Sequence, residues 1–178
     1  MQADDRTASA AAPRPAPVPA TAREGSLHHI VVVGGGAGGL ELVTRLGDTL
    51  GKRGRARVAL IDRARTHLWK PLLHSVAAGS MDPGAHELDY LAQAHWHDFR
   101  YRFGEVIGLD RTKKQVLLAA TYDDEGRQIT PPRAVPYDTL VIAVGSINND
   151  FGAATAAEFA VPGETPEQAA RFNRRLVN

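Results

Sequence analysis

Five glycines follow a run of β-branched residues near the start of the chain, in the stretch IVVVGGGAGGL from Ile30 to Leu40. Glycine loses more backbone freedom on folding than any other residue, so a cluster of it indicates close approach of the backbone to something else. Gly34, Gly36 and Gly39 satisfy the spacing G-x-G-x-x-G, which dinucleotide-binding proteins place between a strand and a helix. The spacing predicts a tight turn at Gly34, approach of a pyrophosphate at Gly36, and close helix packing at Gly39.

The chemistry of this motif comes from main-chain N–H groups at the positive end of a helix. The first N–H groups of a helix have no partner inside it, and the helix dipole adds positive potential there, so phosphate oxygens bind at that end. Asp62 lies 23 residues beyond Gly39, where a carboxylate can accept hydrogen bonds from ribose hydroxyls. This acid disfavours a 2′-phosphate and hence NADP, although the neighbouring Arg63 weakens that argument. FAD and NAD share the geometry, so the motif alone leaves both open.

The hydrophobic pattern predicts the elements that must position these residues. The run from His28 to Val33 is continuous and largely apolar, which is typical of a strand buried on both faces, and Arg57 to Asp62 has the same character. Between them, apolar residues recur at helical spacing, which predicts a helix over residues 38–50. Together these elements form a βαβ unit, whose two strands are expected to be parallel.

Short helices and strands are predicted over the rest of the ordered part. KPLLHSVAAG and HELDYLAQAHW each predict a short helix, and the alternation at the start of FRYRFGEVIGLD predicts a strand over Phe99 to Asp110. Further strands are predicted in KQVLLAATY, around residues 133–136 and in YDTLVIAVGS, with the acidic turn DDEG between the first two. In TPEQAARFNRRLVN, Thr165 as N-cap and Gln168 three residues later form a capping box at the start of an amphipathic helix.

Composition restricts the class of protein. The chain has 178 residues, 43% hydrophobic and 23% charged, which suits one domain with a core and is too little for two full-sized domains. The net charge of +1 does not indicate nucleic acid as a partner, and no apolar run reaches the ~18 residues of a membrane span. The absence of cysteine excludes disulfides, thiolate zinc sites and redox-active dithiols.

Other candidate chemical groups give weaker signals. Seven histidines invite a metal site, but His95 and His97 lie two positions apart on a predicted helix and do not share a face. The acidic residues of DDEG belong to a turn, where solvated charge is usual, and the nucleophile motif G-x-S-x-G is absent. We therefore expect no metal site and assign no catalytic residue.

Four stretches resemble the type II NADH dehydrogenases, also called NADH:quinone oxidoreductases: HHIVVVGGGAGGLELVTRLG, VALIDR, HLWKPLLHSVAAGSMD and YDTLVIAVGSINNDFG. The resemblance runs from about His28 to the end of the chain, and WKPLLH is its most specific part. It implies an α/β fold similar to glutathione reductase, with a Rossmann-like FAD-binding domain, a parallel sheet and a β-meander, here apparently truncated. Members of this family pass hydride from NADH to FAD and electrons on to quinone at the membrane.

The resemblance also implies which residues contact FAD. The pyrophosphate would be surrounded by Gly34, Gly36, Ala37, Gly38 and Gly39. A turn close to the flavin is matched by Ala143, Val144, Gly145 and Ser146, with valine at the family's usual threonine. Asp62 would bind the adenosine ribose, and Val106 would meet the adenine through its backbone. Lys70 and Pro71 would lie near the flavin ring.

The chain is expected to divide into three parts. Composition predicts that residues 1–26 are a disordered, Ala/Pro-rich tail. The resemblance implies that residues 27–164 are an incomplete FAD-binding domain and that residues 165–178 are the start of a helix leading into an absent NADH domain. NADH and quinone would be partners of the longer enzyme. That enzyme would lie on the cytoplasmic, inner face of the membrane, contacting it only through an absent C-terminal part.

Two functions remain open. In the first, the chain is the FAD-binding portion of a flavoprotein oxidoreductase that passes hydride from NADH to FAD and electrons to quinone. In the second, it is a non-catalytic nucleotide-binding module or an inactive remnant of such an enzyme. In either case we expect no NADH oxidation by this chain alone, because hydride transfer needs both reacting partners held in contact.

Overall fold

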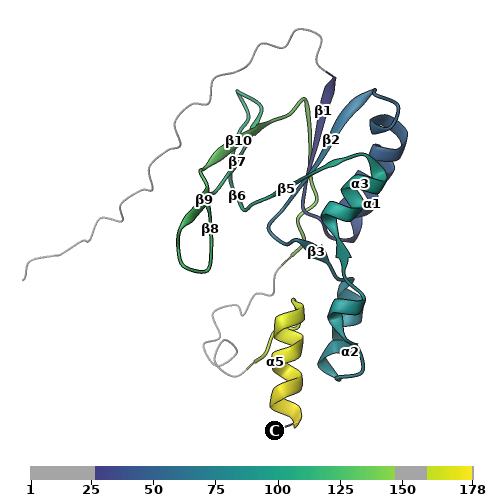
Figure 1. Cartoon of the computed structure of the whole chain (residues 1–178), viewed down its shortest axis with the longest axis vertical. Helices are drawn as coiled ribbons and strands as arrows, with labels where there is room; N and C mark the ends of the chain where they lie inside the picture. The colour runs from purple at the N-terminus through teal and green to yellow at the C-terminus, as the bar shows by residue number, and fades with distance from the viewer. Residues whose placement is uncertain (1–26, 147–159, 178) are drawn as a thin grey trace, which may run out of the picture.

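A four-stranded parallel sheet forms the centre of the fold in the computed structural model, which describes residues 27–146 and 160–177 (Figure 1). The strand order is β11-β1-β2-β5. The strands are β1 His28–Val33, β2 Ala56–Asp62, β5 Arg100–Phe103 and β11 Thr139–Ile142. Strand β1 pairs in parallel with both β2 and β11, which confirms the predicted parallel βαβ pairing. The tail predicted over residues 1–26 lies outside the described residues.

Helices cover one face of this sheet and a β-meander covers the other (Figure 1). The helices are α1 Ala37–Leu46 and α3 Tyr90–His97. The meander is antiparallel, in the order β10-β7-β6, and comprises β6 Val106–Asp110, β7 Gln115–Leu118 and β10 Arg133–Pro136. Alternate residues of β1 face opposite sides, so Val32 joins the core beneath the helices while Val31 and Val33 join the core beneath the meander.

Helix α1 ends earlier than the pattern predicted. Residues Gly47–Gly51 form a π-helical turn, and the glycine at each end of it allows another backbone segment to approach closely. A Cβ on Gly47 would lie 1.9 Å from the carbonyl oxygen of His97, and one on Gly51 would lie 2.4 Å from that of Asp98. The end of α3 therefore lies directly against this turn.

The strand predicted over Phe99 to Asp110 is wrong as a single element, because β5 and β6 belong to different sheets. Gly104 lies between them with φ of 154°, a conformation that residues with a side chain rarely adopt. The stretch KQVLLAATY is likewise divided, since β7 ends at Leu118 and β8 Thr121–Tyr122 pairs instead with β9 Gln128–Thr130. The predicted DDEG turn connects β8 to β9.

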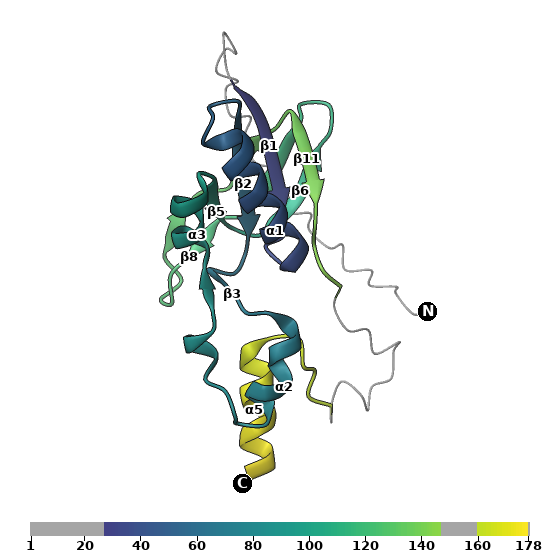
Figure 2. The ribbon, with the colours of Figure 1, turned by 90° about the vertical axis from the view of Figure 1, so that its right-hand side faces the viewer.

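A small helical lobe lies beyond the carboxyl ends of the parallel strands (Figure 2). Its elements are β3 Thr66–His67, η2 Lys70–Leu72, α2 Leu73–Ala77, η3 Pro83–Ala85, β4 Leu88–Asp89 and α5 Pro166–Val177. Helices α2 and α5 lie side by side around a core of Leu68, Leu73, Val76 and Ala169. We call this part the α2–α5 lobe. Across residues 27–146 and 160–177, no helix is long and apolar enough to span a membrane.

The N-terminus of α5 has a modified form of the predicted capping box. The backbone N–H of Gln168 donates to the Thr165 hydroxyl at 3.3 Å, as expected for an N-cap. The Gln168 side chain, however, accepts from the N–H of Glu164 at 2.9 Å rather than from that of Thr165. This contact fixes the backbone of Glu164 just before α5.

Candidate dinucleotide-binding site

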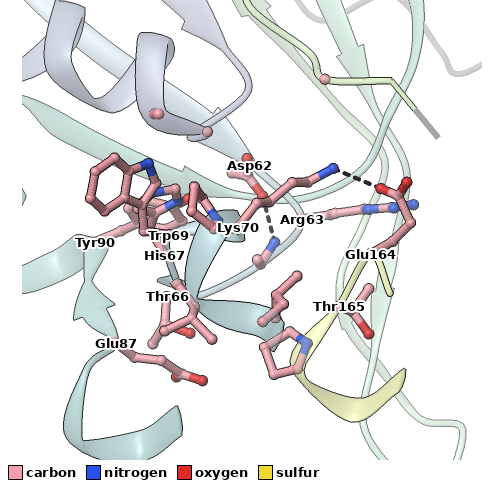
Figure 3. Close-up of a pocket in the computed structure, with 18 of the residues that line it drawn as sticks. Asp62, Arg63, Thr66, His67, Trp69, Lys70, Glu87, Tyr90, Glu164 and Thr165 are labelled. Atoms are coloured by element: carbon pink, nitrogen blue, oxygen red, sulfur yellow. Dashed lines mark hydrogen bonds and ion pairs between the residues drawn. The ribbon is translucent and has the colours of Figure 1, made fainter. Parts of the chain in front are cut away.

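Two adjoining cavities lie between the carboxyl ends of the parallel strands and the α2–α5 lobe. Their volumes are about 630 and about 460 Å³. Figure 3 shows side chains that line the larger cavity. Residues shared by both cavities are Gly36, Asp62, Arg63, Lys70, Ala143, Gly145, Ser146, Glu164 and Thr165. Strand order reverses between β1 and β11, and open α/β sheets bind their ligands at such a switch point.

All the cofactor residues predicted from the sequence line one or both cavities, except Gly39. The larger cavity alone is lined by Ala37, Gly38 and Pro71, and the smaller alone by Gly34, Val106 and Val144. Gly39 is buried at the start of α1 instead. The structure therefore brings five separate stretches of sequence to one place, and their contact with a cofactor stays a prediction.

Of the three glycines in the G-x-G-x-x-G motif, two are required by packing and one faces open space. Gly34 has φ of 101°, and a Cβ there would lie 2.6 Å from the carbonyl oxygen of Ala143. A Cβ on Gly39 would lie 1.9 Å from the carbonyl oxygen of Gly34, so this glycine packs α1 against the turn itself. A Cβ on Gly36 would meet no atom of residues 27–146 or 160–177 within 4 Å. That open side faces the cavities, so a ligand can approach the backbone there.

The N-terminus of α1 is free to bind an anion. Gly36 is the N-cap residue, no side chain in the described part of the chain caps the helix, and its first turn contains no acidic residue. The first hydrogen bond inside the helix runs from the N–H of Leu40 to the carbonyl of Gly36 at 2.8 Å. The three N–H groups that precede Leu40 therefore have no acceptor inside the helix. Backbone donors at a helix N-terminus beside open space fit a diphosphate.

Asp62 has a structural contact that the sequence did not reveal. One carboxylate oxygen accepts from the N–H of Gly35 at 2.5 Å, and the other accepts from the N–H of Ala64 at 2.7 Å. Asp62 therefore shapes the glycine turn. A carboxylate has about four lone-pair positions, so each oxygen can still accept a ribose hydroxyl from the cavity side.

Tyr90 is a second residue that sequence reasoning missed. It is 2% exposed, borders the larger cavity, and donates its hydroxyl to the carbonyl of Gly35 at 2.6 Å. Burial raises the pKa of Tyr90 well above its ordinary value, so the hydroxyl keeps its proton at neutral pH. Burial also raises the pKa of the adjacent Tyr101 to about 12. No local motif points to Tyr90, because its partner lies 55 positions away.

Charged groups line the wall that the cavities share. The ammonium of Lys70 forms an ion pair with the Glu164 carboxylate at 2.7 Å (Figure 3). It also lies 3.5 Å from the carbonyl oxygen of Ser146. Glu164 was not predicted, since it lies 94 positions from Lys70. Arg63 also lines both cavities. The shared wall therefore carries two cationic side chains, Arg63 and Lys70, balanced by two carboxylates, Asp62 and Glu164, so the anion-binding character of the site comes from the backbone N–H groups of the glycine turn.

His67 lines the larger cavity, and its surroundings favour the neutral imidazole. Burial lowers the pKa of its imidazole, and the nearby Asp62 opposes that shift only in part. Within residues 27–146 and 160–177, no group of three or more histidine, cysteine, aspartate or glutamate side chains could hold a metal ion. The arrangement provides groups that can bind and orient a ligand, and redox chemistry would have to come from that ligand.

A parallel sheet with a glycine turn at its switch point, helices on one face and a β-meander on the other defines a Rossmann-like dinucleotide-binding domain. Residues 28–178 match the family described as pyridine nucleotide-disulphide oxidoreductase. The chain belongs to this family.

Two curated relatives support the resemblance to type II enzymes. The chain is 45% identical over 151 residues to the type II NADH:quinone oxidoreductase of Haemophilus influenzae, covering 85% of this chain and 34% of that protein. It is 30% identical over 154 residues to the type II NADH:quinone oxidoreductase NdhA of Mycobacterium tuberculosis, covering 86% of this chain and 30% of that protein. The chain thus spans about a third of the length of these relatives.

Solved structures confirm the fold. NDH2 from Plasmodium falciparum in complex with NADH matches with a TM-score of 0.67 and 19% identity, covering 84% of this chain and 29% of that one. The sulfide:quinone oxidoreductase from Aquifex aeolicus matches with a TM-score of 0.66 and 21% identity, covering 84% and 32%. The predicted α/β class with a parallel sheet and a meander is therefore confirmed.

Proposed function

We propose that this chain binds FAD across the two cavities and is the FAD-binding portion of a type II NADH:quinone oxidoreductase. The observation that carries the proposal is the uncapped N-terminus of α1, which lies at the switch point of the sheet. Its N-cap residue, Gly36, has open space on the side where a Cβ would be. The 45% identity to the H. influenzae enzyme supports the same assignment. FAD would supply the hydride and electron chemistry, accepting hydride from NADH and passing electrons to quinone.

The chain's own residues would bind and orient this cofactor. Backbone N–H groups at Ala37 and Gly38 would hold the diphosphate, and Asp62 would accept from ribose hydroxyls while holding the turn. Lys70 would bring positive charge to the wall between the cavities. NADH, quinone and peripheral contact with the inner face of the membrane would involve parts of an enzyme beyond this chain.

Gly36→Val tests the proposal through binding. The purified chain is titrated with FAD while flavin fluorescence is followed, and we expect saturable quenching. Valine at position 36 should weaken FAD binding at least about 100-fold, because its side chain would occupy the space beside the diphosphate. The free energy of unfolding without ligand should change by less than about 1 kcal/mol, since no protein atom lies within 4 Å of the added Cβ.

Gly84→Val is the matched control. Gly84 lies in η3, in neither set of cavity-lining residues, and the nearest atom to an added Cβ is 3.5 Å away. It should leave FAD binding unchanged. Failure of the unaltered chain to bind FAD, or equal binding by Gly36→Val, would refute the proposal. Binding without NADH oxidation is expected of the chain alone, and it is also what a non-catalytic nucleotide-binding module would show.

A further inference from the structure

The hydroxyl of Tyr90 is held rigidly against the glycine turn. Tyr90 begins α3, and its ring lies in the core between the helices and the sheet, with its centroid 5.3 Å from that of Tyr101. The hydroxyl donates to Gly35 at 2.6 Å, and a Cβ on Gly35 would lie 2.3 Å from the same oxygen. Only a glycine therefore allows this contact, and a buried ring cannot move away from it.

This contact sets the direction of the next N–H group. In a trans peptide the C=O and the following N–H point in opposite directions, so holding the Gly35 carbonyl toward Tyr90 aims the Gly36 N–H away from Tyr90. The preceding peptide is held as well, because the Gly35 N–H donates to Asp62. Glycine peptides rotate easily when nothing holds them. Here both peptides that flank Gly35 are fixed by residues far along the chain.

We propose that Tyr90 is a positioning residue for the phosphate-binding turn: its hydroxyl orients the Gly35–Gly36 peptide so that the Gly36 N–H is presented to the diphosphate of the bound nucleotide. The inference rests on the proposed function, since it assumes a dinucleotide at the glycine turn. It adds a specific consequence. Tyr90 would contribute to binding of the diphosphate group and not to binding of the adenosine, whose ribose would contact Asp62.

Tyr90→Phe tests this with two ligands that differ only in the diphosphate, ADP and adenosine. Both are titrated into the isotope-labelled chain and followed by amide NMR shifts, which measure weak as well as strong binding. Phenylalanine keeps the ring and its packing but removes the hydrogen bond to the Gly35 carbonyl, so the Gly35–Gly36 peptide can rotate. We expect ADP affinity to fall about tenfold, because one charge-assisted backbone hydrogen bond is misdirected. Adenosine affinity should change less than about twofold.

Tyr122→Phe is the matched control, because Tyr122 is 59% exposed on β8 and lines neither cavity. It should leave both affinities unchanged. Equal loss of ADP and adenosine affinity in Tyr90→Phe, or no loss of either, would overturn the inference while leaving the FAD proposal standing. If the unaltered chain bound neither ADP nor FAD, both would fall.

A measurement on the unaltered chain does not depend on how the variant folds. The amide proton of Gly36 should shift strongly downfield when ADP binds and little when adenosine binds, because only ADP brings an acceptor to that N–H. An ADP complex in which the Gly36 amide stays at its free position would overturn the role of Tyr90.

Discussion

The two walls of the cavities are held together in different ways. The glycine turn is fixed by close backbone packing that leaves no room for a Cβ on Gly34 or Gly39. It is also fixed by two hydrogen bonds of Gly35, whose N–H donates to half-buried Asp62 and whose carbonyl accepts from buried Tyr90. The α2–α5 lobe holds its side of the site with a small apolar core and an ion pair whose lysine side chain is 57% exposed. Close backbone packing tolerates no added atom, whereas an exposed ion pair contributes little free energy. The turn should therefore be far more sensitive to substitution than the lobe.

Gly39→Ala should have the largest effect on folding. The added Cβ would lie 1.9 Å from the Gly34 carbonyl oxygen, so α1 would have to move away from the turn. We expect the free energy of unfolding to fall by about 3 kcal/mol or more, measured by urea denaturation of the chain without ligand. Gly38→Ala is the control, since nothing lies within 4 Å of its added Cβ and alanine favours a helix by up to about 1 kcal/mol. Equal stability of the two variants would contradict the packing argument.

The contrast between the walls also explains what the sequence could predict. The glycine turn, β1, α1 and β2 follow from local spacing, because their requirements fall within about the ~30 residues of one βαβ unit. Tyr90 and Glu164 could not be found in this way, since each acts on a partner more than fifty positions away. A contact between residues so far apart in the sequence produces no periodic pattern that could predict it.

Errors in the predicted elements have a similar origin. The alternation over Phe99 to Asp110 is real in each half, but it does not show that Gly104 sends the second half into another sheet. The helix predicted to Leu50 keeps its apolar spacing past Leu46, while the π-helical turn that replaces it depends on contact with the end of α3. Tertiary contacts decided both cases, and a single sequence contains no direct signal of them.

Asp62→Asn should have an intermediate effect, and it separates two roles of this residue. Asparagine has one acceptor oxygen, so it can keep the bond from Gly35 or the bond from Ala64 but not both. We expect the ligand-free chain to lose about 1–2 kcal/mol of stability, measured by thermal or urea denaturation. If Asp62 served only to bind ribose, the stability of the ligand-free chain would not change.

Asp82→Asn is the matched control for that variant. Asp82 is an N-cap whose carboxylate accepts one backbone bond, from Gly84 at 3.0 Å. Asparagine can make the same single bond, and the two residues are about equally good N-caps, so stability should change by less than about 0.5 kcal/mol. A loss as large as that of Asp62→Asn would mean that charge, rather than the number of acceptors, decides the effect at both sites.

Lys70→Met should have the smallest effect on folding and therefore measures how loosely the lobe wall is held. In its ion pair with Glu164 the lysine side chain is 57% exposed and the glutamate side chain 22% exposed, so the ligand-free chain should lose less than about 1 kcal/mol of stability. Lys52→Met is the control, because Lys52 pairs with Asp48 at the same 2.7 Å and lines neither cavity. The two variants should have similar stability. Only Lys70→Met should weaken FAD binding, by a few-fold. Added salt should reduce this difference in FAD affinity, because it screens exposed charges. Destabilisation of the ligand-free chain by more than about 1.5 kcal/mol would show that the lobe wall is held as firmly as the glycine turn, because an exposed ion pair alone does not contribute that much.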